Sequence, residues 1–496
     1  MKDSRIAGLF NNTVRILFII LMTVIVAATV FIDRKVSGDA FNASFLTTVT
    51  HANIWYYLAA ALIGAGVIYI LLKTPSLSDR GFYFASLIVV MLVFIWQCFV
   101  ARWLPADISG VDFGTIKLAA IDLAYGGGRL SEYGYFSASP NNANMAIFLA
   151  ILYRLVPHWT AIIILGALST NFAALFVSLT VRNYTKNNKT ALLLLFASEI
   201  LLGMNWRAFL VYTDNFGMLF VAAALWLGSL DITYKVKVPL VTAAITIACF
   251  IKVTNFILFM AFGIYFLLNC TQNHMEYFKR VVYAIICFGV IFSLQIGARN
   301  ILRDHYGFAA SEKAKDWRYL FMVGQNVDSY GTVNNIDPGI REDFLDMYET
   351  AAEAKHAMFA EGIRRVKERG LSGNVSFFFH KLDVAYGDGY FHNVQNAGAD
   401  WDNSFLANVY KRGGSYYWVM ATILQIIWDA ALLCLLVGGG LYQKKDRILG
   451  LYYLVIGAVT VYLMCFEGRS KYIFMFLPVY MIAAGLSFEM LAKKIR

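Results

Sequence analysis

Charged residues are scarce in this 496-residue chain, where Asp, Glu, Lys and Arg make up 15% of the sequence against about 25% in average soluble proteins. Proline is also scarce, at seven residues, whereas aromatic side chains reach 16%. This composition excludes a disordered chain and a set of soluble domains, because apolar stretches of about 20 residues recur from end to end. The sequence therefore predicts an all-α, polytopic membrane protein.

Patterns typical of disulfide frameworks and metal sites are also missing. None of the six cysteines belongs to a CxxC motif, and His380 and His392 lack zinc-site spacing. We therefore expect neither a disulfide framework nor a metal ion. The formal net charge of +10 does not indicate nucleic-acid binding, because the basic residues gather in short connectors of the kind that stay in the cytoplasm.

Twelve apolar segments are candidates for membrane spans. They are 14–33, 55–73, 82–104, 161–181, 190–206, 213–230, 238–251, 253–270, 281–300, 415–441, 447–465 and 473–492. A shorter apolar stretch, 143–156, lies between Pro140 and Pro157. If it crosses only partly, all the basic connectors fall on one side of the membrane. We therefore predict a re-entrant or short helix there, with both termini in the cytoplasm.

Two long segments then lie on the outer side of the membrane. The predicted regions are an N-terminal membrane part (1–301) with a first outer loop (105–142), an extracytoplasmic segment (302–414) and C-terminal helices (415–496). Apolar residues recur at helical spacing over 113–124 and 340–368. This spacing predicts amphipathic helices in the outer loops, the second of them ending at Gly370.

Two acidic residues, Asp107 and Asp112, follow the third apolar segment at the level of the membrane surface. A carboxylate held there suits a general base that acts on an acceptor delivered beside the bilayer. An acid in an exposed loop is more often only solvated, and that interpretation of Asp112 stays open. Asn141 and Asn142, close to aromatic residues, fit either a sugar-binding rim or an interfacial belt.

Ionisable residues at the ends of later apolar segments are stronger candidates. Asp214 opens the segment 213–230, although an acid at that position also complements the helix dipole. Lys252 interrupts the apolar block 238–270. A lysine within hydrophobic sequence is a functional candidate, with snorkelling to the interface as the alternative.

The outer turn between the last two segments is unusually basic. It contains Arg469 and Lys471, followed by Tyr472. Basic residues on the outer side break the positive-inside pattern, which predicts an anionic partner such as a lipid phosphate. In the second outer loop, Lys381 and Asp388 fit either a contact with sugar or phosphate or a solvated helix end.

Taken in order, these motifs resemble those of bacterial membrane glycosyltransferases of the GT-C fold, which use polyprenyl-phosphate-linked sugars and are distantly related to the dolichyl-phosphate-mannose protein mannosyltransferases. The matching residues share the outer side of the predicted topology: Asp112 in Val-Asp-Phe-Gly, Tyr135-Phe136 before Pro140-Asn141-Asn142, Asp214 in Tyr-Thr-Asp, Lys252 in Ile-Lys-Val-Thr, Lys381 with Asp388-Gly389, and Glu467, Arg469, Tyr472 and Pro478. Two features depart from the family pattern. The second acid, Asp107, is not adjacent to Asp112, and an extra hairpin precedes the expected first helix.

The resemblance implies a GT-C-like fold of about twelve transmembrane helices in the plasma membrane. It also implies an inverting transfer of sugar from polyprenyl phosphate to an extracytoplasmic glycan, glycolipid or protein acceptor, with no cofactor beyond the lipid-linked sugar. The implied roles are Asp112 as base, Asp214, Asn141, Asn142, Lys381 and Asp388 as donor- or acceptor-binding residues, and Lys252, Arg469, Lys471 and Tyr472 as lipid-phosphate ligands.

Two other classes of membrane protein stay open. A polymerase or ligase of lipid-linked glycans would depend on outer arginines and histidines, and the second outer loop offers Arg341, Arg364, Arg365, His380 and His392. A transporter of lipid or sugar is the further alternative. Transporters place charges near the bilayer midplane and often contain inverted repeats. The sequence shows no repeat, and we expect no charged residue clearly in mid-segment.

Overall fold

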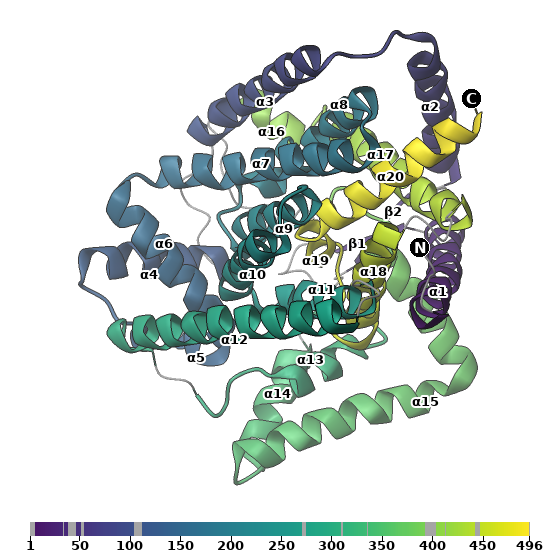
Figure 1. Ribbon diagram of the computed structural model, residues 1–496. Helices are drawn as coiled ribbons and strands as arrows, with labels where there is room; N and C mark the ends of the chain where they lie inside the picture. Colours follow the sequence, from purple (N-terminus) through teal and green to yellow (C-terminus); the bar gives the residue numbers. More distant parts are fainter. Residues whose placement is uncertain are drawn as a thin grey trace.

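The protein is described by a computed structural model over residues 5–32, 34–37, 46–50, 54–103, 112–269, 274–308, 311–334, 336–391, 403–411, 413–441 and 447–495. Helices make up most of this part of the chain and form a bundle with a projecting outer segment (Figure 1). Two short strands, β1 (Arg34–Ser37) and β2 (Leu46–Thr50), pair antiparallel. This small ladder is a departure from the expected all-α architecture.

Within the described residues, eight helices are long and apolar enough to cross a membrane. They are α1 (Arg5–Phe31), α2 (Ile54–Lys73), α3 (Asp79–Arg102), α7 (Trp159–Thr185), α10 (Tyr234–Ile251), α12 (His274–His305), α17 (Tyr417–Leu441) and α18 (Arg447–Cys465). The other four apolar segments correspond to α8 (Asn188–Ser198), α9 (Thr213–Ser229), α11 (Phe256–Asn269) and α20 (Leu477–Ile495). The structure is therefore that of a polytopic membrane protein.

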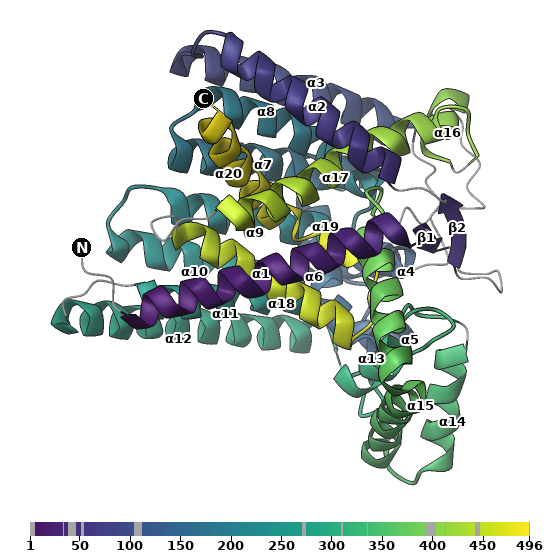
Figure 2. The ribbon, with the colours of Figure 1, turned by 90° about the vertical axis from the view of Figure 1, so that its right-hand side faces the viewer.

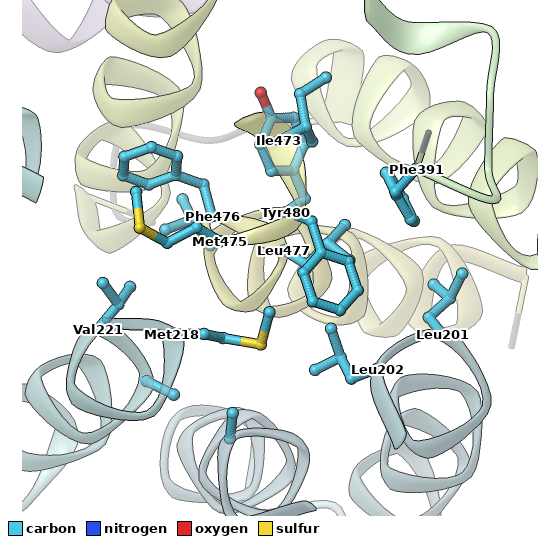
Figure 3. Close-up of a cluster of buried hydrophobic side chains, with 14 of the residues drawn as sticks. Leu201, Leu202, Met218, Val221, Phe391, Ile473, Met475, Phe476, Leu477 and Tyr480 are labelled. Carbon is cyan, nitrogen blue, oxygen red and sulfur yellow. The ribbon is translucent and has the colours of Figure 1, made fainter. Parts of the chain in front are cut away.

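The helices differ in how much of their surface is buried inside the protein. Only 6% of the most apolar window of α12 is buried, so most of its apolar side chains face outward, as lipid contact requires. Helix α20, in contrast, is nearly enclosed and packs against α17, α7, α18, α8 and α9. Figure 3 shows the α19–α20 stretch facing Met218 and Val221 of α9, with Leu201, Leu202 and Phe391 beside it. This core fixes the start of α20 next to the start of α9.

The first outer segment forms a series of short elements. They are α4 (Asp112–Tyr125), η1 (Leu130–Glu132), α5 (Gly134–Ala138), η2 (Pro140–Asn142) and α6 (Ala143–Leu155). The helix predicted over 113–124 corresponds to α4. Helix α6 has 13 residues and is therefore about 20 Å long at 1.5 Å per residue, which is short of the roughly 30 Å hydrocarbon core. Its length fits the predicted short helix.

The second outer segment differs from the single helix expected over 340–368. Its helices are α13 (Trp317–Gly324), α14 (Ile336–Met347), α15 (Ala351–Tyr386) and α16 (Ser404–Tyr410). The expected helix is divided because Thr350 caps the start of α15 in a reciprocal pair with Glu353. Gly370, at φ 60° and ψ −173°, is not helical, so α15 consists of two helices that meet at a kink there, and the predicted helix end at Gly370 is confirmed.

The two ends of the bundle are distinct. In Figure 2 the labelled termini lie on the left, while α4, α16 and the β1–β2 ladder lie on the right. At the end near the C-terminus, Arg182 pairs with Asp79 at 2.8 Å and Asn187 donates to Glu489 at 2.8 Å. The beginning of α9, the end of α10 and the 467–472 turn lie at the other end, where the predicted site residues gather.

Candidate functional site

Asp214 lies at the centre of a charged cluster. It occupies the first turn of α9, is 2% exposed and pairs with two cations. Its Oδ2 lies 2.5 Å from Nη2 of Arg207, and its Oδ1 lies 2.5 Å from Nζ of Lys252. Two cations on one carboxylate leave a positive excess at this point.

Local geometry explains why these two cations reach Asp214. Arg207 lies in the 3₁₀ turn η4 (Trp206–Phe209), where its backbone N–H donates to the side chain of Asn205, the N-terminal cap, at 3.0 Å. Lys252 is the C-terminal cap of α10 and is followed by the short turn η5 (Val253–Asn255). Both side chains therefore start from helix ends next to the start of α9, as expected for Lys252 from its position between two apolar segments.

Aromatic rings surround the two cations. Nζ of Lys252 lies 6.0 Å from the ring centre of Tyr212 and 5.4 Å from that of Tyr472. The guanidinium of Arg207 lies 5.4 Å from the ring centre of Phe474. Cation–π contacts of this kind hold a positive charge in place without neutralising it.

Asp112 is connected to this cluster by a chain of polar side chains. Asp112 begins α4, is exposed, and lies near the hydroxyl of Tyr135. Burial, followed by the charge of Asp112, raises the pKa of Tyr135 above its usual value. Asn142 then donates to the hydroxyl of Tyr135 and, at 3.2 Å, to that of Tyr212. The exposed carboxylate thus reaches the rings around Lys252.

Arg303 of α12 fixes the turn that carries Asn142. It donates to the carbonyl of Pro140 at 3.0 Å and to Oδ1 of Asn144 at 2.8 Å. Asn141, in the same turn, is exposed. Only the second asparagine of the predicted pair therefore points into the cluster.

The 467–472 turn adds two further cations. Glu467 accepts from the hydroxyl of Tyr472 at 2.7 Å and pairs with Nε of Arg469 at 3.4 Å. Nη2 of Arg469 also donates to the carbonyl of Val333 at 2.6 Å. These contacts tie the turn to the second outer segment.

Lys471 is buried within reach of the charges of four other residues at this end of the bundle. Burial lowers its pKa to about 8, and the like charges of Arg469 and Arg207 act in the same direction. Glu467 and Asp112 act against that shift. Lys471 is therefore close enough to all four groups to be affected by their charges. Such a clustered positive field suits a phosphate group.

Lys381 and Asp388 lie behind the turn. Lys381 is fully buried, and its Nζ donates to the carbonyls of Gly324, Met464 and Phe466. These three carbonyls use the three N–H donors of an ammonium group, so Lys381 joins the ends of α13 and α18. Asp388 accepts from Ser470 at 3.1 Å and from the backbone N–H of Tyr390 at 3.0 Å. Both residues support the turn from inside the protein.

The structure therefore separates the predicted residues into three groups. Those brought together are Asp112, Asn142, Asp214, Lys252, Arg469, Lys471 and Tyr472. Lys381 and Asp388 lie in the supporting layer, and Asn141 is exposed. Asp107 and His392 fall outside the described residues.

Arg207 is the functional candidate that the sequence interpretation missed. The sequence did contain a signal for Arg207. It directly follows the apolar segment 190–206, and it carries the opposite charge to Asp214, seven positions later. Among the described residues, no group of three or more His, Cys, Asp or Glu side chains could hold a metal ion. The cluster therefore consists of cations, aromatic rings and the carboxylates of Asp112, Asp214 and Glu467.

The expectation of no charged residue clearly in mid-segment is wrong, because Glu199 and Asp429 both lie near the middle of their segments and are buried. Glu199 lies in the segment 190–206 and is 1% exposed. It belongs to the π-helical turn η3 (Glu199–Gly203), which continues α8. Hydropathy did not reveal it, because one acid among leucines and isoleucines hardly lowers the average.

Comparisons with known proteins give one match. A family model described as "Conserved hypothetical integral membrane protein" matches residues 6–492, and thus nearly the whole chain. No curated protein and no solved structure matches the chain.

Proposed function

The chain belongs to this family of conserved hypothetical integral membrane proteins, and we propose that it is an inverting glycosyltransferase. In this proposal it moves a sugar from a polyprenyl-phosphate donor to an acceptor on the extracytoplasmic face of the plasma membrane. The acceptor is a cell-envelope glycan, a glycolipid or a protein. Both termini lie in the cytoplasm, and the lipid-linked sugar is the co-substrate.

The observation that carries the proposal is the convergence of an exposed carboxylate with four cations. Asp112 faces the same cluster as Arg207, Lys252, Arg469 and Lys471, although these residues span more than 350 positions of sequence. A sugar linked to a lipid phosphate presents two matching groups, namely a reacting carbon and an anionic leaving group. One carboxylate and several cations fit these two requirements.

The proposed step is a single displacement at the anomeric carbon. The acceptor oxygen forms a bond to that carbon while its proton passes to the carboxylate of Asp112. The bond between the anomeric carbon and the phosphate oxygen breaks, and the electron pair leaves with polyprenyl phosphate. Lys252, Arg469 and Lys471 stabilise the charge that develops on the phosphate, which is usually the largest catalytic contribution. Attack from the opposite side of the ring inverts the anomeric configuration.

The arrangement of the outer arginines gives no support to the polymerase or ligase alternative. Each arginine is paired with carboxylates of its own segment: Arg341 with Glu342, Arg364 with Glu361 and Glu368, and Arg365 with Asp337 and Glu361. His380 is hydrogen-bonded to the carbonyl of Ser376 at 2.8 Å and stacks on Tyr330. These contacts give the side chains structural roles within the outer segment.

The proposal is tested by measuring which class of lipid-linked donor the protein uses. Purified protein in liposomes is offered radiolabelled undecaprenyl-phosphate monosaccharides or undecaprenyl-diphosphate oligosaccharides, together with a cell-envelope extract as acceptor. We expect release of undecaprenyl phosphate from a monosaccharide donor and a product of inverted anomeric configuration. Consumption of the oligosaccharide donors alone would favour the polymerase or ligase, and movement of intact lipid between leaflets would favour a transporter.

A further inference from the structure

A cavity of about 550 Å³ lies between α2, α3 and α8, at the end of the bundle opposite the candidate site. Figure 2 shows these three helices together at the top of the bundle. The volume falls within the range of about 300–1,000 Å³ that is typical of ligand pockets. Apolar side chains form most of the wall, namely Leu71, Leu77, Ala85, Val89, Leu192 and Phe196. A hydrocarbon group is therefore the kind of group that fits inside.

The cavity belongs to the side of the bundle that faces lipid. Of the most apolar window of α2, 17% is buried, and of that of α3, 22%, against 61% for α7. Phe196, in the wall of the cavity, is 55% exposed. Since these outward apolar surfaces require lipid around them, the cavity is filled from the bilayer.

One residue of the wall, Lys189 in the first turn of α8, is a cation. Its Nζ donates to the carbonyl of Leu71, to the carbonyl of Thr74 at 2.9 Å and to Oγ1 of Thr74 at 3.3 Å. These neutral acceptors hold the ammonium group at the end of α2, and no carboxylate among the described residues pairs with it. The positive charge therefore stays at the cavity, and the long contact with Oγ1 of Thr74 is the one that an anion would replace.

The connector between α2 and α3 adds further positive charge. Lys73 ends α2 and Arg80 follows the first residue of α3; both are exposed, and neither pairs with a carboxylate in the part of the chain that the structure describes. The acid beside them, Asp79, is already bound by Arg182 and by Asn188, each at 2.8 Å. The rim of an apolar cavity is thus cationic.

We propose that this cavity binds one anionic phospholipid of the membrane, with an acyl chain in the cavity and the headgroup phosphate at Lys189. The apolar wall requires a chain, which a free phosphate lacks, and the cationic rim favours a headgroup with net negative charge. Basic pockets between membrane helices on the cytoplasmic side bind headgroups of this kind, and the predicted topology places this end of the bundle there. The proposal is independent of the proposed glycosyl transfer, since neither site contributes a residue to the other.

Thermal unfolding with added lipid tests this site. The full-length protein in detergent micelles is melted with increasing amounts of phosphatidylglycerol, which is anionic, or of phosphatidylcholine, which is zwitterionic. We expect the melting temperature to rise and to saturate with phosphatidylglycerol alone, because a ligand that binds only the folded state stabilises it. Native mass spectrometry of the same samples should detect one retained phosphatidylglycerol. Glycerol 3-phosphate, which has the phosphate without the chains, should leave the melting temperature unchanged.

Two variants act on different parts of the bound lipid, so that either is informative if the other fails to fold. Lys189→Gln removes the charge but keeps an N–H donor for the carbonyls, and it should lose the preference for phosphatidylglycerol. Ala85→Trp fills the cavity without changing a charge and should lose the response to lipid. Lys235→Gln is the matched control, since Lys235 is an exposed lysine of α10 outside the cavity, and it should respond like the wild type.

Three results would overturn the proposal. Equal stabilisation by the two lipids would show that the cavity takes lipid without regard to charge. Stabilisation by glycerol 3-phosphate equal to that by phosphatidylglycerol would assign the rim to a soluble anion. A phosphatidylglycerol response that persists in both Lys189→Gln and Ala85→Trp would place the bound lipid elsewhere on the protein.

Discussion

Lys252 and Asp214 are 38 positions apart in the sequence, yet Nζ of the lysine and Oδ1 of the aspartate lie 2.5 Å apart. The pair joins the end of α10 to the beginning of α9. The side chain of the aspartate is 3% exposed and that of the lysine 16%, so the pair is largely shielded from solvent and the lysine is its more exposed member. This relationship places a cation at the edge of the cluster that contains Asp112.

Replacement of Lys252 by methionine should affect both stability and donor affinity. The variant removes one of the two cations paired with Asp214, and the loss of a hydrogen bond to a charged group costs about 1.5–3 kcal/mol. We expect a lower melting temperature and a higher KM for a polyprenyl-phosphate sugar. Lys252→Arg keeps the charge and should restore most of the stability. Unchanged melting and unchanged KM in Lys252→Met would contradict the role given to this lysine.

The pH dependence of donor use should report on Lys471. Because the pKa of Lys471 is lowered to about 8, its positive charge is present below that pH and is lost as the pH rises through it. We expect kcat/KM for the donor to decline above about pH 8. Lys471→Arg keeps its charge throughout this range and should remove the decline. If the two pH profiles coincide, another group controls donor use.

Asn142 and Asn141 form a matched pair of neighbouring residues. Asn142→Ala removes the link between Tyr135 and Tyr212, which holds Tyr135 beside Asp112. We expect this variant to lower kcat more than it raises KM, because misplacement of a base slows the chemical step. Asn141→Ala alters an exposed residue and should transfer sugar at the wild-type rate. Equal loss in both variants would point to the fold of the turn instead.

Lys381 should act through the turn that it supports. Lys381→Met removes the donor from three carbonyls, one of them in a fully buried bond, and loss of a buried hydrogen bond costs about 1–3 kcal/mol. We expect a marked fall in melting temperature together with weaker donor binding. Lys367→Met changes an exposed lysine on the same helix and serves as the control. A Lys381→Met protein that melts normally but no longer binds donor would give Lys381 a direct contact with the substrate.

The features of the fold that depend on local sequence could be predicted. Apolar run length located the membrane helices, and the shortness of 143–156 anticipated α6. Because the sequence places Asp214, Lys252 and Arg469 next to apolar segments on one predicted side, their approach to one another could also be anticipated. Arg207 could have been found by the same reasoning, because it also lies next to an apolar segment and its charge is opposite to that of Asp214.

Features that depend on packing between distant segments could not be predicted. The sequence indicated a sugar or phosphate contact for Lys381, but its partners depend on where α13 and α18 end. The division between α14 and α15 follows from the cap at Thr350, which competes with a continuous amphipathic pattern. The π-helical turn at Glu199 leaves no periodic signal, because a single extra residue in one helical turn does not change the surrounding hydropathy.

Asp112 provides the most direct test of the proposed glycosyl transfer. Asp122, at the other end of α4, accepts a hydrogen bond from Tyr133 and provides a control on the same helix. Sugar transfer from an undecaprenyl-phosphate donor and equilibrium binding of undecaprenyl phosphate are measured for Asp112→Asn and Asp122→Asn. We predict that Asp112→Asn binds the lipid like the wild type but transfers sugar about 10²–10⁴-fold more slowly, whereas Asp122→Asn keeps both properties. Transfer by Asp112→Asn at the wild-type rate would contradict the account.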